Sequence, residues 1–174
     1  MPSRRRERPD PFQHRNLPLL LLQAREAVLA RFRPVLHSHG LTEQQWRIVR
    51  LLLASGPLEP RQIGQRVRIL SPSLVGILAR MDELGLVRRE RLAADQRRVR
   101  VSLTPRSRAL AAAMAPAIEA VYAGIESQIG ADFVARFYAA LDELIGQLEQ
   151  RPPATGSCGH QRRHDPFAGD ARRR

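Results

Sequence analysis

Residues 71–89, with the sequence SPSLVGILARMDELGLVRR, decide the fold because a helical pattern gives way there to a strand pattern. The apolar residues of the helical part recur at the spacing of one helix face, namely Leu74, Leu78, Met81 and Leu84. Ser71-Pro72 is typical of a helix start. Gly85 is typical of a helix end, because glycine adopts the left-handed cap at little cost. After Gly85 the period changes from helical to two, with Val87, Arg89 and Arg91 on one strand, so the stretch predicts a helix followed directly by a β-strand.

The residues before this stretch carry start and stop signals for three more helices. Pro18 suits the first turn of a helix that continues for about five turns and stops at Gly40. Residues 42–45, with the sequence TEQQ, form a capping box that opens a second helix, which ends near Ser55-Gly56. Glu59-Pro60 opens a short third helix. This third helix and the helix of residues 71–84, separated by a tight turn, predict a helix-turn-helix.

The residues after the stretch predict a hairpin and two long helices. Residues 98–103 alternate between polar and apolar side chains, and they complete a two-stranded hairpin. Residues 104–128 begin with Thr-Pro and form an alanine-rich helix, which we expect to bend at Pro116. Asp132 is expected to cap a last amphipathic helix that ends at Leu148. The predicted fold is mainly α with a small β-hairpin, arranged as a winged helix-turn-helix.

The positive charge is concentrated in the predicted helix-turn-helix and hairpin. All 29 basic residues are Arg, and the formal net charge is +12. Residues 61–108 hold 12 Arg and four acids, whereas residues 17–60 and 109–150 together hold six Arg and nine acids. The hairpin arginines are Arg88, Arg89, Arg91, Arg97, Arg98 and Arg100. Because these cations repel one another unless a polyanion neutralises them, the pattern predicts nucleic-acid binding.

The helix of residues 71–84 is predicted to read DNA with the face opposite its apolar stripe. That face carries Ser73, Gly76 and Arg80. Small residues allow a helix to lie deep in a major groove. Ser71 and Ser73 can bond phosphates or base edges, and Arg80 can bind a guanine or a phosphate. The alternative is an ordinary amphipathic helix with a solvated polar face. The arginine-rich hairpin argues against that alternative, because a solvated surface mixes charges of both signs.

Three segments resemble the MarR family of bacterial transcriptional regulators: Leu84-Gly85-Leu86-Val87, the expected wing turn Asp95-Gln96-Arg97-Arg98, and Ser102-Leu103-Thr104. The resemblance covers about residues 17–150. It implies that Arg97 enters the minor groove at the wing tip while Asp95 holds the Arg97 guanidinium in place. A narrow minor groove attracts arginine, which agrees with this role. One departure is Val75, where the family usually has Thr, so the reading face lacks a hydroxyl.

The resemblance also implies a homodimer in which the terminal helices pack against the partner subunit. The expected organisation is a disordered Arg-rich tail over residues 1–16, dimerisation helices over 17–39 and 105–150, the winged helix-turn-helix over 41–104, and a second disordered tail over 151–174. The chain therefore combines a DNA-binding domain with a helical dimerisation domain.

The first two helices narrow the resemblance to the MarR-family regulators of homoprotocatechuate degradation, through residues 22–27, 32–34 and 41–50. That branch represses genes for 4-hydroxyphenylacetate catabolism and is released by the aromatic acid. Such a ligand needs a cation for its carboxylate and an apolar slot for its ring. The candidates are Arg25 for the carboxylate, and Phe32, Arg33 and Trp46 for further contacts. The alternatives are that Arg25 pairs with Glu26 or another acid, and that Trp46 belongs to the core.

The sequence also bears on catalysis, metal binding and membrane association. The sequence contains no catalytic motif, so we expect neither an enzyme nor a cofactor. Cys158, His160 and His164 have a spacing that resembles metal ligands, but no fourth ligand is nearby and we expect no metal. We expect a cytoplasmic, nucleoid-associated protein without a membrane segment, because the apolar run at 17–22 is too short to span a bilayer. Two alternatives remain: a MarR-type regulator of a different phenolic acid, and a nonspecific nucleic-acid or architectural binder.

Overall fold

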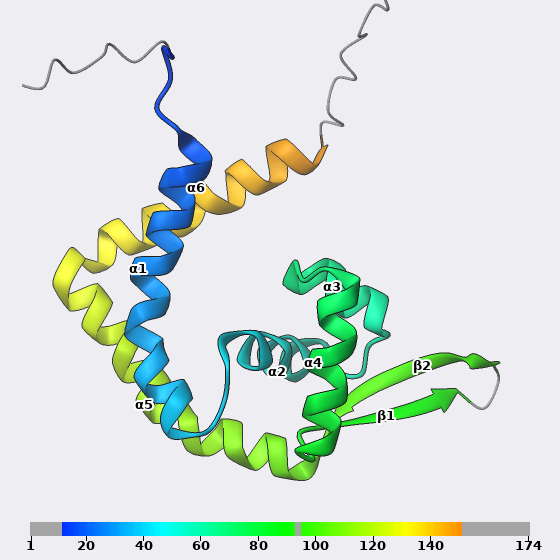
Figure 1. The fold of residues 1–174 in the computed structure, drawn as a ribbon. Coiled ribbons are helices and arrows are strands. Elements are labelled where there is room, and N and C mark those ends of the chain that lie inside the picture. The colour runs from blue at the N-terminus through cyan, green and yellow to red at the C-terminus, as the bar shows by residue number, and fades with distance from the viewer. Residues whose placement is uncertain (1–11, 93–94, 151–174) are drawn as a thin grey trace, which may run out of the picture. The chain divides into compact units, whose positions relative to one another are not determined.

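The computed structural model describes residues 12–92 and 95–150, and Figure 1 shows their arrangement. The elements in chain order are α1 (Leu17–Ser38), α2 (Glu43–Ser55), α3 (Pro60–Val67), α4 (Ser71–Glu83), β1 (Val87–Leu92), β2 (Asp95–Leu103), α5 (Pro105–Ile129) and α6 (Ala131–Gln150). The two strands form one antiparallel sheet. The mainly helical fold class with a single hairpin is thereby confirmed for the described residues.

Side-chain caps explain where the first helices begin. Asn16 accepts a hydrogen bond from a first-turn amide of α1 at 3.0 Å, a cap that the sequence analysis missed. Thr42 and Gln45 form the predicted capping box, with hydrogen bonds of 2.9 and 3.2 Å. At the start of α3 the Gln62 side chain accepts from the Glu59 amide at 3.0 Å. The predicted helix starts are therefore correct for α2 and α3.

Helices α3 and α4 pack closely because of a glycine. A Cβ atom on Gly64 would lie 3.1 Å from Cδ2 of Leu74 and 3.2 Å from the carbonyl oxygen of Ile69, so a larger residue would push α4 away. The turn between the helices places Arg68 in the left-handed region at φ 54°, where non-glycine residues are uncommon. The predicted helix-turn-helix is thus built around contacts that neither helix reveals alone.

Two of the segments that resemble the MarR family meet where the hairpin joins α5. Gly85 ends α4 with φ 64°, the left-handed conformation that the sequence predicted. The Thr104 hydroxyl donates to the Gly85 carbonyl at 2.7 Å and accepts from the Ser107 amide at 3.1 Å. Thr104 therefore begins α5 and also fixes the end of α4, which places the hairpin between two anchored helix ends.

The wing is an antiparallel hairpin tied to the segment that leads into α3. Val87 pairs with Leu103, and Arg91 pairs with Val99. Leu58 exchanges both backbone hydrogen bonds with Val101, at 3.1 and 2.8 Å. The hairpin is consequently held to the helix-turn-helix by backbone bonds as well as by its own ends.

The prediction that Asp95-Gln96-Arg97-Arg98 forms the wing turn is wrong. β2 begins at Asp95, which pairs with Leu92 across an irregular register step between Arg91 and Leu92. Cross-strand pairing therefore extends further toward the tip than the alternation of side chains suggested. Only residues 93 and 94 separate the strands, and they lie outside the described residues.

α5 contributes Ala111, Met114 and Ile118 to a core that it shares with α1 to α4 and the hairpin. Pro116 lies inside α5, and Figure 1 shows that the helix changes direction along its length. By length and composition α5 also meets the criteria for a membrane-spanning helix. A single such helix does not identify a membrane protein, because core helices of soluble proteins meet the same criteria.

α6 belongs to a second compact unit that begins at Ile129. The prediction that Asp132 caps this helix is wrong, because the helix begins at Ala131 and Asp132 lies in its first turn. There its carboxylate still interacts favourably with the helix dipole. Five large apolar side chains of α6 are exposed: Phe133, Phe137, Tyr138, Ile145 and Leu148. Of the predicted disordered tails, only residues 12–16 fall within the described part of the chain.

Candidate nucleic-acid interface and ligand cavity

The outer face of α4 carries the residues that were predicted to read DNA. Ser71, Ser73, Gly76 and Arg80 are all exposed, while Leu74, Leu78 and Met81 are buried on the opposite side. Arg80 forms an exposed ion pair with Glu83 at 3.0 Å, one helical turn further along. A pair of this kind contributes little to stability, so Arg80 can exchange Glu83 for a phosphate or a base. Ser71, Ser73 and Gly76 keep the face small near the helix start.

Gly76 lies on this face without any internal reason for a glycine. A Cβ atom there would have nothing within 4 Å, and the backbone of Gly76 has no left-handed conformation. A glycine inside a helix destabilises it by about 0.5–1 kcal/mol relative to alanine. The absence of a side chain there would let another molecule approach the helix backbone closely.

The wing presents more arginines than its acids can neutralise. Arg88 pairs with Glu90 at 3.3 Å. In the part of the chain that the structure describes, four exposed hairpin arginines have no acidic partner within 4 Å: Arg89, Arg91, Arg97 and Arg100. The excess cations lie on exposed strands, which suits a phosphate backbone.

Asp95 holds the backbone of the wing tip. Its carboxylate accepts from the Arg97 amide at 3.0 Å, and this contact differs from the grip on the Arg97 guanidinium that the family resemblance implied. The Arg97 side chain is exposed. Asp95 thus fixes the main chain from which Arg97 projects.

Arg98 has a partner from a distant part of the sequence. Its guanidinium pairs with Glu59 at the start of α3, with Nε donating at 3.0 Å and a second, shorter hydrogen bond from an Nη nitrogen. The hydrogen bonds to Glu59 raise the pKa of Arg98. Arg98 is therefore held against the helix-turn-helix, whereas Arg97 is not.

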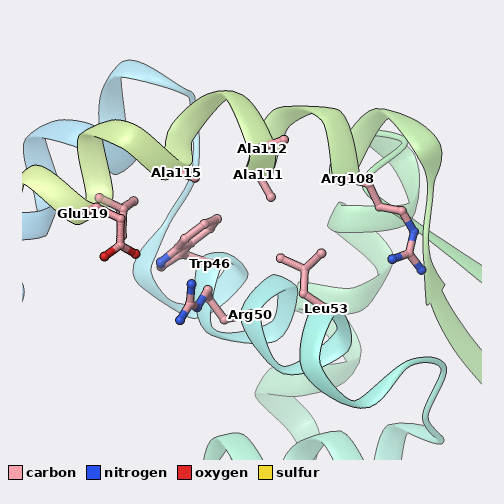
Figure 2. Close-up of a pocket in the computed structure, with 9 residues that line it drawn as sticks. Trp46, Arg50, Leu53, Arg108, Ala111, Ala112, Ala115 and Glu119 are labelled. Carbon is pink, nitrogen blue, oxygen red and sulfur yellow. The ribbon is translucent and has the colours of Figure 1, made fainter.

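A cavity of about 260 Å³ lies between α2 and α5. Its walls are mostly apolar, with Trp46 and Leu53 on α2 facing Ala111, Ala112, Ala115 and Ile118 on α5. The charged residues at its margin are Arg50, Arg108 and Glu119. Figure 2 shows Trp46, Arg50 and Glu119 gathered toward one end of the cavity and Arg108 at the other. An aromatic wall, small alanines opposite it and a cation at the margin suit a small aromatic acid.

Comparison with known proteins decides the family. Residues 39–98 match the MarR family. The homoprotocatechuate degradative operon repressor of Escherichia coli is 44% identical over 132 residues, which cover 76% of this chain and 89% of the repressor. The chain belongs to the MarR family.

Two further relatives extend the comparison. The transcriptional regulator FarR of Neisseria gonorrhoeae is 38% identical over 149 residues, which cover 86% of this chain and 99% of FarR. The solved structure of NadR in complex with 4-hydroxyphenylacetate matches with a TM-score of 0.67 and 36% identity, and the match covers 83% of this chain and 97% of NadR. As the resemblance implied, this MarR-family chain has relatives among regulators of aromatic metabolism.

The four predicted effector residues of this MarR-family chain occupy three different places. Trp46 lines the cavity. Phe32 is buried in the core and packs edge-to-face on Tyr122, with ring centroids 4.9 Å apart. Arg25 and Arg33 do not line the cavity but lie in the cluster where α1 meets α2.

That cluster consists of Arg25, Glu26, Arg33 and Glu43, and we call it the α1–α2 junction. Glu43 is shared by Arg25 at 3.6 Å and Arg33 at 2.6 Å, and Arg33 also contacts Glu26 at 2.6 Å. The hydrogen bonds to Glu26 and Glu43 raise the pKa of Arg33. The structure shows the alternative in which Arg25 pairs with an acid, here Glu43.

The charged residues of the cavity were not predicted from the sequence. Arg50 is one helical turn beyond Trp46 on α2, a spacing that places both on the same face. The alanines of α5 provide the second signal, because a run of small residues opposite a tryptophan leaves room for a ligand. Among the described residues no group of three possible metal ligands occurs. Cys158, His160 and His164 lie outside the described residues.

Proposed function

We propose that this chain is a homodimeric repressor of an aromatic catabolic operon, released from its operator by a phenolic acid such as 4-hydroxyphenylacetate or homoprotocatechuate. The observation that carries the proposal is the cavity between α2 and α5, with Trp46 on its wall and Arg50 at its margin. Its support comes from the E. coli repressor, at 44% identity, and from NadR, whose solved complex contains 4-hydroxyphenylacetate. The proposal assigns the protein no catalytic activity and places it in the cytoplasm, where it reaches DNA.

DNA binding is assigned to α4 and the wing, which we call the DNA-facing surface. α4 would enter the major groove with Ser71, Ser73, Gly76 and Arg80 toward the bases and phosphates. The wing would reach the neighbouring minor groove with Arg97. The support is the exposure of these residues and, within the described part of the wing, an excess of cations without an acidic partner.

A dimer is assigned because apolar side chains of the terminal helices are exposed in the single chain. On α1 these are Leu17, Leu19, Leu21 and Leu22, and α6 adds the five residues named above. Exposed apolar groups of this number are typical of a subunit interface. The corresponding division of the chain is residues 17–39 and 105–150 for dimerisation and 41–104 for DNA binding.

The effector is assigned to the cavity, because α2 joins the cavity to the helix-turn-helix. Arg47, also on α2, donates to the carbonyl of Val67 at the end of α3 at 2.8 Å, and burial lowers the pKa of this guanidinium. A ligand that spreads or closes α2 and α5 would therefore move α3 and α4. Release from DNA requires that the ligand bind the displaced arrangement more tightly than the DNA-bound one.

The test is fluorescence anisotropy of the full-length protein at about 0.15 M salt. The labelled duplex carries DNA from upstream of the chain's own gene, and a scrambled duplex is the control. We expect the specific duplex to bind about 1,000-fold or more tightly than the scrambled one, and 4-hydroxyphenylacetate or homoprotocatechuate to abolish that preference. Equal binding to both duplexes, unaffected by either acid, would show a nonspecific nucleic-acid binder instead.

The same assay separates effectors and identifies the cation that holds the carboxylate. Specific binding that neither acid disturbs would indicate a MarR-family regulator of a different phenolic acid. Arg50→Ala and Arg25→Ala, each titrated with the active acid, distinguish the cavity from the α1–α2 junction. We expect Arg50→Ala to raise the half-effective ligand concentration about tenfold or more and Arg25→Ala to raise it less. A larger effect of Arg25→Ala than of Arg50→Ala would mean that Arg25 binds the carboxylate, as the sequence predicted.

A further inference from the structure

The DNA-facing surface carries an apolar side chain that the fold does not use. Val75 lies on α4, next to the buried Leu74, yet 62% of it is exposed. By helical spacing it shares a stripe with Ser71 and Ala79, and Gly76 follows it directly. The start of α4 therefore presents a methyl-bearing side chain beside an open stretch of backbone.

Neither packing nor helix propensity explains a valine at this position. The apolar stripe of α4 is already formed by Leu74, Leu78 and Met81, which are buried. A β-branched residue on an exposed helix surface is less favourable than alanine, because the preceding turn restricts its χ1 angle. Gly76 is similarly unexplained within the chain. Two neighbouring residues that lower helix stability on one exposed face indicate that this face is shaped for something outside the chain.

We propose that Val75 is a specificity-determining residue that packs a γ-methyl group against the C5-methyl of a thymine in each half-site. This proposal rests on the proposed function, which places α4 in the major groove. Thymine is the base that projects a methyl group into that groove, and apolar side chains read it by contact. Gly76 removes the side chain that would hold the helix away, so Val75 can reach the base edge.

A protein partner is the less suitable occupant of this face. The exposed residues of α4 around Val75 are small or polar, namely Ser71, Pro72, Ser73, Gly76 and Arg80, and Leu70 just before the helix is a second exposed apolar side chain at this end. Val75 and Leu70 together supply far less apolar area than a protein interface requires, whereas Val75 alone is sufficient for one methyl group. The excess of arginine on the adjacent wing also favours a polyanion.

The experiment removes the methyl group from each side of the contact in turn. Full-length protein is titrated against its specific duplex and against duplexes in which each thymine is replaced, one position at a time, by uracil, which lacks only the C5-methyl. We expect one position per half-site at which uracil weakens wild-type binding about fourfold, the value for losing one methyl-sized apolar contact. Val75→Ala should weaken binding to the thymine duplex by a similar factor and show no further loss with uracil at that position.

Arg97→Ala is the matched control for a general loss of affinity. It should weaken binding to every duplex while keeping the fourfold thymine-to-uracil ratio. Position 75 is exposed and alanine favours the helix, so Val75→Ala should fold normally. Circular dichroism verifies that the variant keeps its helix content. The proposal about Val75 would be overturned if wild-type protein binds the specific duplex but no position is sensitive to uracil. It would also be overturned if Val75→Ala is still sensitive to uracil at the same position. If the wild-type protein shows no preference for the specific duplex, the proposed function is overturned instead.

Discussion

The wing and the α1–α2 junction are both rich in arginine, but they use it in opposite ways. At the junction, Arg25 and Arg33 face Glu26 and Glu43, so each cation has an acid within 4 Å. On the wing, Arg89, Arg91, Arg97 and Arg100 have no acid at that distance among the described residues. The junction satisfies its charges internally and joins two helices, whereas the wing keeps charges for a partner. Composition alone does not separate these two uses; the position of the acids does.

The largest effect should come from Arg97. Arg97→Ala is expected to weaken operator binding by about tenfold or more, because it removes a cation that has no acidic partner among the described residues. The slope of log affinity against log salt is negative, and its magnitude should decrease by about one for each Arg97 that contacts DNA. Anisotropy titrations at several salt concentrations measure both quantities.

Arg98→Ala is the matched control on the same strand. Because Arg98 is already paired with Glu59, its removal should weaken DNA binding less than removal of Arg97. Equal losses for the two variants would erase the distinction between paired and unpaired arginines. Effector affinity should be nearly unchanged in both variants.

A second prediction concerns Gly76, where stability and binding should move in opposite directions. Gly76→Ala should raise the free energy of unfolding by about 0.5–1 kcal/mol, since the new methyl group meets no neighbour. The same methyl group should reduce operator affinity about tenfold by holding α4 away from the groove. Urea denaturation and anisotropy provide the two values, and a variant that gains stability without losing affinity would contradict the close approach.

A third prediction concerns the acid shared at the α1–α2 junction. Glu43→Gln should lower the thermal unfolding midpoint by about 3 °C, because Arg25 and Arg33 lose their common partner. Operator affinity should change less than twofold, since these residues lie away from the DNA-facing surface. A large loss of DNA binding without a change in the midpoint would mean that the two regions are not separate in function.

The smallest effect should follow the release of Arg98. Glu59→Gln removes the acid that neutralises this arginine, so the wing gains a free cation. We expect about twofold tighter binding to a scrambled duplex and a slightly steeper salt dependence. Tighter binding that appears only on the specific duplex would instead make Arg98 a reader of sequence.

Local signals predicted most of the elements, and long-range contacts account for what was missed. The capping box of Thr42 and Gln45 and the left-handed Gly85 were predictable because each depends on residues close in sequence. The Arg98–Glu59 pair joins residues 39 positions apart, and the local sequence around either residue does not predict the contact. Likewise, Gly64 is explained only when α4 lies against it.

The candidate site was predicted unevenly for the same reason. The outer face of α4 follows from helical spacing, so its exposed residues were identified from sequence. The cavity requires α2 and α5 to lie together, so Trp46 was found and Arg50 was not. The wing turn was misplaced, because alternation of side chains does not reveal where cross-strand pairing ends.

The two backbone bonds between Leu58 and Val101 have a consequence for motion. Because they join the hairpin to the segment that leads into α3, the wing and the helix-turn-helix should turn as a single rigid body. The amide protons of both residues should then exchange with solvent as slowly as those of the core. In a dimer, an effector that rotates this body alters the separation of both recognition helices and both wing tips at once. A duplex has a fixed helical repeat and therefore fits only one separation of the recognition helices and wing tips. A small rotation is enough to end binding.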